Sequence, residues 1–267
     1  MVGLIYRAPE YSPRDNVSKD AAILEAVGKA LKSRGESICF LHEEDLLTEG
    51  ANVLSKCTHC VSMARRHRSL LALQGWQQRG LQFLNRPNSV QVTVQSRSTT
   101  LDLLSSVGAP VAPYWSYEPA EDEMFQCEPD LQALLPGWVK AMHPRGVTEG
   151  DVCRVDTPLE ADTRILQCAA EGYTDIIVMQ HLQGPLLKAY VVGDKHWFKT
   201  EEKVVLEKAN ACLGDYLNKI RGVLNLEVFG VDFICTESGS YVIDVNDFPS
   251  FSACRNEASL AIASLVL

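Results

Sequence analysis

The chain has 267 residues, 46% of them hydrophobic and 22% charged, a composition typical of a globular protein with one large or two small domains. It carries 25 Lys and Arg against 34 Asp and Glu, a formal net charge of -9, which argues against nucleic acid or an anionic membrane as a partner. No apolar run reaches the ~18 residues of a membrane span, and the opening residues lack a signal-peptide pattern, so we expect a cytoplasmic protein.

The N-terminal third of the chain alternates short apolar runs with helical spacing. In chain order it predicts a strand over 3–7, a helix over 17–31, strands over 37–41 and 57–63, a helix over 69–79 and a strand over 81–84. Gly35 is well placed to end the first helix. A β-α-β start predicts parallel strands with a right-handed crossover. Residues 1–87 therefore predict a small doubly wound α/β unit.

The rest of the chain changes rhythm and predicts hairpins mixed with helices. In chain order it predicts a helix from Asn88 or Ser89 toward Val107, a loop or short helix over 119–136, a hairpin of strands 137–142 and 152–155, a helix over 157–172, strands over 176–182, 186–192 and 196–199, a helix over 201–221 closed by Gly222, a hairpin of strands 228–235 and 241–245, and a final helix over about the last fifteen residues. The helix that starts after Thr157 has a capping box that ends in Glu160. This part of the chain predicts an α+β architecture.

Two acids and an amide meet across the last predicted hairpin. Asp232 lies inside an apolar strand, and Asp244 and Asn246 share one face of its neighbour because they are two residues apart. Burying the two acids costs several kcal/mol each unless a positive group neutralises them. Oxygen ligands at this density suit Mg²⁺ or Mn²⁺ that holds substrate phosphates. The alternative is that all three are satisfied polar residues at strand ends.

The stretch from Val228 to Phe251 resembles the C-terminal signature of the ATP-grasp superfamily, in which a strand acid is followed by an Asp/Glu-x-Asn strand that chelates two Mg²⁺ ions on ATP. Earlier stretches extend the resemblance over about residues 85–260. Lys140 looks like the strand lysine that contacts the nucleotide, and 143–151 looks like the phosphate-covering loop. Residues 178–184 are similar to the adenine hinge. Residues 187–193, Leu-Lys-Ala-Tyr-Val-Val-Gly, are similar to a strand of RimK-type ligases and of inositol-trisphosphate 5/6-kinases.

The resemblance implies an α/β and α+β chain with the ATP-grasp fold. It implies a Rossmann-like pre-ATP-grasp domain over 1–87, a central lid region over 88–182 and a C-terminal domain with the metal site over 183–267. ATP and Mg²⁺, with Mn²⁺ as the alternative ion, are the implied cofactors. The implied reaction transfers the γ-phosphoryl group to a small-molecule carboxylate, and an amine captures the acyl-phosphate. Assembly with further copies of the chain stays open.

Two alternatives to a carboxylate-amine ligase stay open. One is a kinase that acts on an inositol or another polyol phosphate, whose anionic groups would need the cations Lys188, Lys195, Lys199 and Arg255. The other is a module that senses ATP without turnover, which the complete set of metal ligands argues against. A hydroxylamine trap for an acyl-phosphate would separate the first alternative from the ligase.

The site residues follow from these motifs. The resemblance assigns the metal to Asp232, Asp244 and Asn246, which form the expected catalytic set together with Lys188 and Arg255. The nucleotide is assigned to Lys140, Met179, Gln180, His181, Leu182, Lys188 and Lys199. Arg255 opens the last helix just after the metal strand, where a substrate-anion role competes with a plain surface position. Two positions depart from the family: Arg97 replaces a lysine at the end of the first domain, and Ser250 replaces a glycine.

For two further clusters we favour a structural role over a functional one. Cys57 and Cys60 have the spacing of one ligand pair, half of a zinc or redox site, but no second Cys or His pair follows at a suitable distance. Buried thiols are therefore expected. The basic run from Arg65 to Arg68 has no interleaved aromatic residues, and a solvated loop is expected in preference to anion recognition. The nine cysteines are scattered and odd in number, which favours reduced, buried thiols over a disulfide framework.

Overall fold

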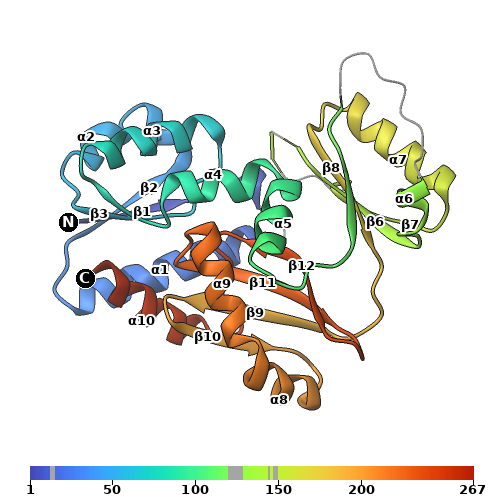
Figure 1. Cartoon of the computed structure of the whole chain (residues 1–267). Helices are drawn as coiled ribbons and strands as arrows, with labels where there is room; N and C mark the ends of the chain where they lie inside the picture. Colours follow the sequence, from blue (N-terminus) through green and yellow to red (C-terminus); the bar gives the residue numbers. More distant parts are fainter. Residues whose placement is uncertain (13–15, 120–128, 144, 147–149) are drawn as a thin grey trace.

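The strands of this protein form three four-stranded sheets, shown in Figure 1. The computed structural model describes residues 1–12, 16–119, 129–143, 145–146 and 150–267. The sheet orders are β2-β1-β3-β4, β5-β8-β6-β7 and β10-β9-β11-β12. Each sheet is built from one of the segments 1–87, 88–182 and 183–267, although these bounds stay a proposal for the domains. Cys127 lies outside the described residues.

The first sheet is parallel throughout, as the β-α-β pattern predicts. Its segment contains β1 (Val2–Tyr6), η1 (Pro9–Tyr11), α1 (Val17–Ser33), β2 (Ile38–His42), η3 (Glu43–Leu47), α2 (Gly50–Leu54), β3 (His59–Ser62), α3 (His67–Gln78) and β4 (Gln82–Leu84). Gly35 has φ +87°, the left-handed conformation expected after a helix end. The short helices η3 and α2 were not predicted, because five residues are too few to show helical periodicity.

The second sheet is antiparallel, and its β6-β7 hairpin is confirmed. Its segment contains α4 (Pro87–Gln95), α5 (Arg97–Ser106), β5 (Tyr114–Tyr117), α6 (Pro129–Gln132), β6 (Gly137–Met142), β7 (Val152–Val155), α7 (Pro158–Ala170) and β8 (Asp175–Gln180). The single helix expected up to Val107 is wrong. Ser96 is extended, with φ -149° and ψ 119°, and caps the second of two helices by accepting from the Thr99 N–H. Strand β5 was not predicted.

The third sheet is antiparallel and carries the predicted C-terminal hairpin. Its segment contains β9 (Leu186–Val192), β10 (Lys195–Lys199), α8 (Lys203–Cys212), α9 (Gly214–Leu224), β11 (Val228–Cys235), β12 (Ser240–Asn246) and α10 (Arg255–Val266). The single helix expected over 201–221 is wrong, since two helices meet at Leu213. Gly222 lies within α9, and Asn225 ends that helix in the left-handed conformation with φ 53°.

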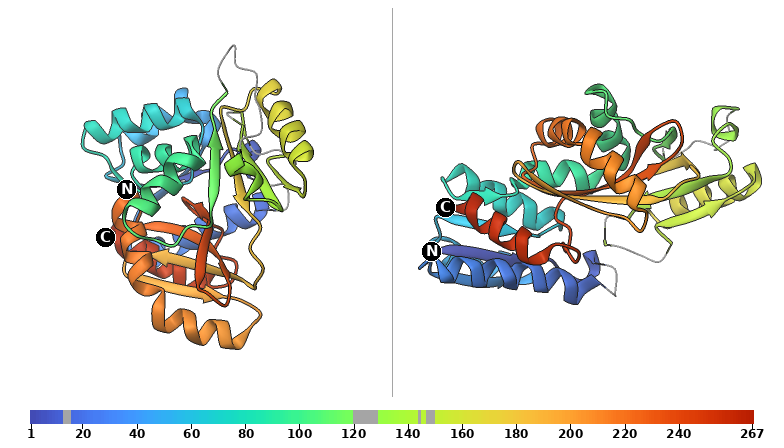
Figure 2. Two further views of the ribbon diagram at one scale, coloured as in Figure 1. Left: turned by 45° about the vertical axis from the view of Figure 1, so that its right-hand side comes forward. Right: turned by 90° about the horizontal axis from the view of Figure 1, so that it is seen from below.

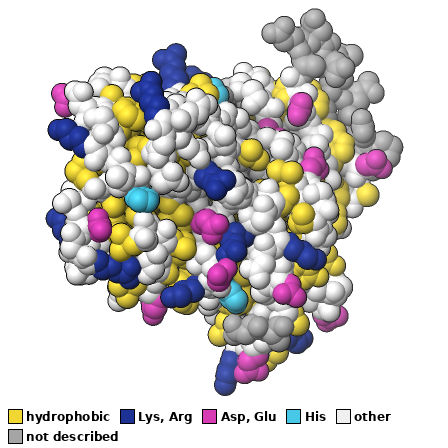
Figure 3. Space-filling model, turned by 60° about the vertical axis from the view of Figure 1, so that its left-hand side comes forward, with side chains coloured by type: hydrophobic (Ala, Val, Ile, Leu, Met, Phe, Trp, Pro, Cys, Tyr) yellow, Lys and Arg dark blue, Asp and Glu magenta, His cyan; other side chains and the backbone are white. Residues whose placement is uncertain are grey.

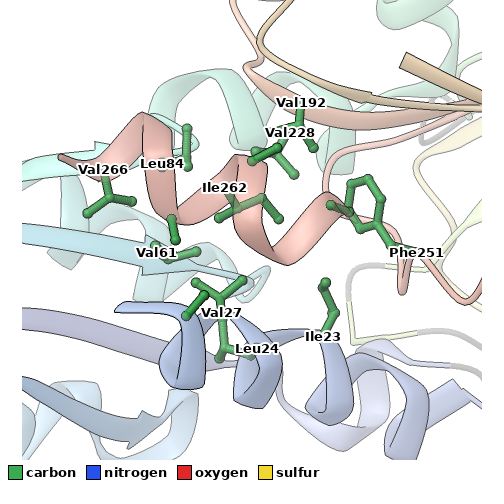
Figure 4. Close-up of a cluster of buried hydrophobic side chains, with 14 of the residues drawn as sticks. Ile23, Leu24, Val27, Val61, Leu84, Val192, Val228, Phe251, Ile262 and Val266 are labelled. Carbon is green, nitrogen blue, oxygen red and sulfur yellow. The ribbon is translucent and has the colours of Figure 1, made fainter. Parts of the chain in front are cut away.

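Helix α10 joins the first and third sheets through one apolar core. Its residues Ile262 and Val266 pack with Leu24 and Val27 of α1 and with residues of β1, β3 and β4. The same cluster reaches Val192 of β9, as Figure 4 shows. The chain end therefore packs against the chain start, and Figure 2 shows both termini on the same side of the molecule.

A buried asparagine fixes the end of β4 against the third sheet. Asn85 Nδ2 donates to the carbonyl oxygens of Val228 and Asp247, each at 2.6 Å. Its Oδ1 accepts from the N–H groups of Glu227 and Val228, each at 2.9 Å. Because all four contacts are to backbone, the side chain holds the start of β11 and the residue after β12 in fixed positions relative to the first sheet.

Candidate functional site

Four charged residues stand in register across the third sheet. Lys199 of β10 is paired with Lys188 of β9, which is paired with Asp232 of β11, which is paired with Asp244 of β12. Directly opposite residues in antiparallel strands point to the same face, so the four side chains form a row across it. The Lys188 Nζ lies 2.8 Å from the Asp232 Oδ2. The predicted proximity of Asp232 and Asp244 across the hairpin is therefore present in the structure.

The same face of this sheet is apolar beside the charged row. Tyr190 and Val192 lie two and four residues after Lys188 on β9 and therefore point to the same face, where they belong to the core shared with α10. The other face packs against α9 through residues such as Leu187 and Phe233. Alternation along the strands thus separates the face that packs against α9 from a face that is apolar at one end and charged at the other.

Asp244 is the point at which cations from two other elements meet. The Arg97 Nη1, at the start of α5, lies 2.6 Å from the Asp244 Oδ1. Burial raises the pKa of Asp244, but the nearby guanidinium of Arg97 and the ammonium of Lys140 outweigh it and bring this pKa below its usual value. The carboxylate is therefore ionised at neutral pH. The pKa of Asp232 is instead raised above its usual value, because burial outweighs the attraction of Lys188.

A buried carboxylate positions Arg97. Asp175, at the start of β8, accepts hydrogen bonds from the Arg97 N–H and from the Ser98 Oγ, the latter at 2.6 Å. A carboxylate at the first turn of α5 also complements the helix dipole. The position of Arg97 is thus fixed by the second sheet, while its guanidinium binds the third. Arg97 is a site residue that the sequence pointed to only as a substitute for a family lysine.

Lys140 is buried between the second and third sheets. Its Nζ donates to the Ile243 carbonyl oxygen at 2.7 Å, directly before Asp244 in the chain. Burial lowers the pKa of this lysine, and the neighbouring Arg97 lowers it further, while Asp244 acts in the opposite direction; the resulting pKa is about 8. A cation with so low a pKa in a partly closed site is typical of functional positions.

The expectation of a solvated loop after β3 is wrong for Arg65. Its side chain is only 15% exposed, and its Nη2 donates to the Asn246 Oδ1 at 2.8 Å and to the Asp247 Oδ1. Its backbone N–H donates to the buried Glu43 carboxylate at 2.9 Å. Arg65 follows the carboxyl end of a parallel strand, where ligand sites of α/β sheets form, and this was the sequence signal that could have identified it.

A cavity of about 500 Å³ lies where these elements meet, within the size range of small-molecule sites. Asp244 and Asn246 line it, together with Arg65 and Arg97. Residues at the carboxyl end of β6 and at α4 and α5 also line it: Thr93, Val94, Gln95, Thr100, Leu101, Ala141, Met142 and His143. Cations from the first and second segments thus contact carboxylate and amide oxygens of the third on the wall of one cavity.

The donor set of the predicted metal site fits a divalent cation in chemistry and in register. Asp232, Asp244 and Asn246 offer only oxygen atoms, from neighbouring positions on two paired strands. Each of the three already has a Lys or Arg side chain as partner. No cluster of three or more His, Cys, Asp and Glu side chains that could hold a metal occurs within the described part of the chain. A metal ion bound here would therefore displace these Lys and Arg side chains from the oxygens or bind the oxygens together with them.

The predicted adenine hinge borders an apolar cluster between the second and third sheets. Met179 and Leu182 pack there with Ile177 and Ile243. The Gln180 and His181 N–H groups donate to the Pro113 and Pro136 carbonyls, at 2.8 and 2.9 Å. The Leu182 N–H has no hydrogen-bond partner among the residues that the structure describes.

The side chain of His181 is turned toward a tryptophan. The Trp138 Nε1 donates to the His181 Nδ1 at 3.0 Å, and the two rings are tilted with centroids 5.9 Å apart. The imidazole is thus engaged with β6. The His181 side chain therefore does not point freely from the hinge.

Three of the cations predicted for the site, Lys195, Lys199 and Arg255, do not line the cavity. Lys199 is exposed at the outer end of the charged row, whereas Lys195 is paired with Val192 at the opposite end of β10. Arg255 opens α10 and is half-buried. None of these three lines the cavity, so the four-cation set expected for a polyol phosphate is not assembled around one point in this structure.

The surface carries both basic and acidic side chains, as the composition predicts. On the face drawn in Figure 3, basic and acidic side chains are interspersed. In the described ranges, no helix combines the length and the hydropathy that crossing a bilayer requires. The Cys residues described are free thiols. The expectation that they are buried is confirmed for Cys60, Cys168 and Cys254, whereas Cys39, Cys57, Cys153 and Cys235 are half-buried and Cys212 is exposed.

Comparison with solved structures identifies the fold. No family model and no curated protein matches the sequence. A D-alanine--D-alanine ligase from Bacillus anthracis matches with a TM-score of 0.72 and 12% identity, covering 99% of this chain and 95% of that one. The same ligase complexed with ATP matches with a TM-score of 0.68 and 12% identity, covering 99% and 98%. A RimK domain ATP-grasp protein from Sphaerobacter thermophilus matches with a TM-score of 0.70 and 15% identity, covering 100% and 99%. The chain has the ATP-grasp fold.

Proposed function

We propose that this chain is an ATP-dependent carboxylate-amine ligase. It transfers the γ-phosphoryl group of ATP to a carboxylate, and an amine then attacks the acyl-phosphate and displaces phosphate. The observation that carries the proposal is the meeting of Arg97 and Lys140 at Asp244 on the wall of a 500 Å³ cavity. The fold, shared with two kinds of ATP-grasp protein of which one is a ligase, supports it.

The charges at the cavity are suited to phosphoryl transfer. Such a reaction needs positioning and electrostatic stabilisation of the phosphates, and no protein nucleophile. Arg97 supplies positive charge on the cavity wall, Lys140 supplies it from a buried position beside Asp244, and Lys188 extends it along the sheet. Asp232, Asp244 and Asn246 are the residues that would hold Mg²⁺, which when bound supplies further positive charge to the β- and γ-phosphates.

The hinge at the end of β8 is suited to a planar base. Met179 and Leu182 offer apolar contact from β8 and its end, and Ile243 offers it from β12. The Leu182 N–H, which has no partner among the described residues, is a donor of the kind that recognises a ring nitrogen. We therefore place the adenine at Gln180 to Leu182, with the His181 ring facing away toward Trp138.

Arg65 extends the cavity toward the first sheet and favours an anionic acceptor. Its guanidinium reaches the Asn246 side chain from a different part of the chain, 181 positions away in the sequence. An arginine offers paired donors that match a carboxylate. The acceptor carboxylate would thus lie between the first sheet and β12, close to the phosphates bound by Arg97.

A polyol-phosphate kinase is the second candidate function. Lys188 and Lys199 stand side by side on neighbouring strands, which offers two cations to a ligand with several phosphates. Against it, Lys195 lies at the far end of β10 and Arg255 lies outside the cavity wall. The ring of cations around one small ligand is therefore incomplete in this structure.

Hydroxylamine distinguishes the two functions chemically. An acyl-phosphate reacts with it to give a hydroxamate, whereas a phosphate monoester does not. We expect hydroxamate to form when the protein is given ATP, Mg²⁺, hydroxylamine and pools of amino acids and carboxylates, and to require both ATP and the acid. The Asp244→Asn variant should form none, while an Asp194→Asn variant, altered at a surface turn, should match the wild type.

The opposite result is equally specific. A stable phosphorylated polyol in mass spectra of an inositol phosphate pool, with no hydroxamate from any acid, would replace the ligase by the kinase. Binding of ATP by calorimetry without turnover in either pool would leave only the nucleotide-sensing module.

A further inference from the structure

Three cysteines meet at the amino ends of the first sheet, on the side away from the cavity. Cys39 of β2 and Cys60 of β3 flank Gly3 of β1, because both are paired with it in register. Cys57 follows α2 and lies over the same place, with its Sγ 3.7 Å from the Cys39 Sγ. All three are free thiols, and none has a role in the proposed reaction.

Gly3 leaves the space that the thiols occupy. A Cβ at this position would lie 2.8 Å from the Cys60 Sγ and 3.4 Å from the Cys57 Sγ. The first of these distances is shorter than carbon and sulfur tolerate, so an alanine at position 3 would push the thiols apart. The backbone of β1 is thus the floor of the cluster formed by Cys39, Cys57 and Cys60, hereafter the thiol cluster.

Cys57 is the acidic member of the thiol cluster. It is half-buried, as is Cys39, and it lines a second cavity of about 400 Å³, together with His59, Trp76 and Arg79. A hydrogen bond from the Cys60 thiol lowers the pKa of Cys57 to about 6, against the effect of burial, and a hydrogen bond from Cys39 adds to the lowering. Cys57 is therefore largely a thiolate at neutral pH.

The partner thiols stay protonated. Burial and, after it, the neighbouring Cys57 raise the pKa of Cys39 to about 12. Cys60 is buried, and its pKa is raised by the hydrogen bond that it gives to Cys57. One reactive thiolate thus lies beside two protonated thiols, which is the arrangement of an attacking and a resolving cysteine. A metal site is not indicated, since no suitable cluster of His, Cys, Asp and Glu occurs in the described ranges.

We propose that Cys57 is a site of oxidation by hydroperoxides and that it then forms a disulfide with Cys39. The Cys57 thiolate attacks the peroxide oxygen, the O–O bond breaks, and a sulfenic acid and one molecule of water or alcohol result. The Cys39 sulfur then attacks the Cys57 sulfur, an S–S bond forms, and the hydroxyl leaves as water with the Cys39 proton. Two thiols are oxidised and one peroxide is reduced.

Cys39 is the resolving partner that the contacts favour. Its sulfur is already within 3.7 Å of Cys57, and it lies on the edge strand β2, which has a neighbour on only one side. The sulfurs have to approach to about 2.05 Å for a bond, which an edge strand and the turn after α2 allow more readily than the inner strand β3. The resulting loop contains Glu43, whose carboxylate accepts from the backbone of Arg65.

The test uses the full-length protein and hydrogen peroxide. After titration with peroxide and blocking of free thiols, the intact mass should show the loss of two hydrogen atoms. Peptide mapping with fragmentation should place the link between Cys39 and Cys57. Before oxidation, iodoacetamide at pH 7 should alkylate Cys57 about two- to threefold faster than free cysteine, because the higher thiolate fraction of Cys57 outweighs its lower nucleophilicity.

Matched variants complete the test. Cys57→Ser and Cys39→Ser should each abolish the disulfide, and Cys212→Ser should leave it unchanged. Cys60→Ala should still form it but react more slowly with iodoacetamide, since the donor to Cys57 is gone. A link between Cys57 and Cys60, first oxidation at Cys212, or no link in the wild type at peroxide levels that oxidise free cysteine would overturn the proposal. Because the wild-type mapping needs no variant, a folding defect in any variant leaves the result readable.

Discussion

One face of the β10-β9-β11-β12 sheet has two halves that differ in chemistry although the same strands build both. In the apolar half, Tyr190 and Val192 pack in the core shared with α10. In the charged half, Lys188 and Asp232 stand in a row that ends at Asp244. The apolar half depends on shape and burial, which many residues share. The charged half depends on individual cations, each supplied by a different element.

This difference separates stability from chemistry along a single strand. Removing apolar surface should lower the free energy of unfolding and leave turnover by the folded protein unchanged. Changing the charged half should alter turnover and leave stability nearly unchanged, since its side chains are partly exposed and water screens their ion pairs. Four substitution experiments test that division.

The largest effect is expected in the apolar half. Ile262 on α10 has 0% exposure and lies between the first and third sheets. Ile262→Ala should lower the free energy of unfolding by about 2–5 kcal/mol, through lost burial and the cavity that remains. Urea denaturation measures this, and ATP turnover per folded molecule should stay at the wild-type value.

Leu260 on the same helix is the matched control, because it is 53% exposed. Leu260→Ala should change the free energy of unfolding by less than about 0.5 kcal/mol. Equal losses in the two variants would show that α10 does not join the sheets through its buried side.

The next effect is expected at the end of the charged row. Asp244→Asn keeps the shape of the side chain but removes the charge that Arg97 and Lys140 face. Turnover of ATP should fall at least ~10²-fold, the scale of losing one strong electrostatic stabiliser. Circular dichroism and the melting temperature should show an intact fold.

Asp194 provides the comparison for a carboxylate that is paired but not functional. It is 90% exposed and contacts Arg221 at the turn after β9. Asp194→Asn should leave turnover unchanged. If Asp244→Asn also keeps wild-type turnover with Mg²⁺ present, the charged half is not the catalytic half.

Sequence periodicity was sufficient for most elements of the fold and insufficient where helices are interrupted. The hairpin strands 137–142 and 152–155 were predicted at the bounds that the structure has. The break at Ser96 was missed, because the apolar spacing continues across it; the Ser96 cap and the contact of Asp175 with the next turn favour two helices. Leu213 interrupts the later helix differently, since its backbone stays in the helical region with φ -92° and ψ -13°.

The site was predictable where strand register encodes it and not where it depends on distant contacts. Asp232 and Asp244 share a hairpin, so local sequence places them opposite one another. Arg65 reaches Asn246 from 181 positions away, and no local pattern specifies such a contact. A basic run in an acidic chain was read as solvated, whereas the carboxyl end of β3 directs its first member into the cavity.

A smaller effect is expected from the protonation state of Lys140. Its pKa of about 8 lies below the ordinary value for lysine, so the folded protein loses this charge at a pH where the unfolded chain keeps it. The kcat/KM for ATP reports the free enzyme and should fall about tenfold per pH unit above pH 8. The free energy of unfolding should rise over the same interval, because the unfolded state then binds more protons.

Lys140→Arg is the matched variant, since its guanidinium stays charged throughout this range. Its kcat/KM should not show the decline above pH 8, whatever its absolute value. A decline of equal midpoint in both proteins would assign the titration to another group.

The smallest effect is expected for the ion pair in the middle of the charged row. Lys188 and Asp232 lie 2.8 Å apart, but their side chains are 41% and 29% exposed, so water screens the pair and its coupling should be at most about 1 kcal/mol. A double-mutant cycle with Lys188→Met and Asp232→Asn measures this coupling from urea denaturation. Asp232→Asn alone should not destabilise the protein, because burial raises the pKa of that carboxyl and its ionisation therefore opposes folding. A coupling of about 3 kcal/mol would instead make the charged half a structural element and remove the contrast between the two halves.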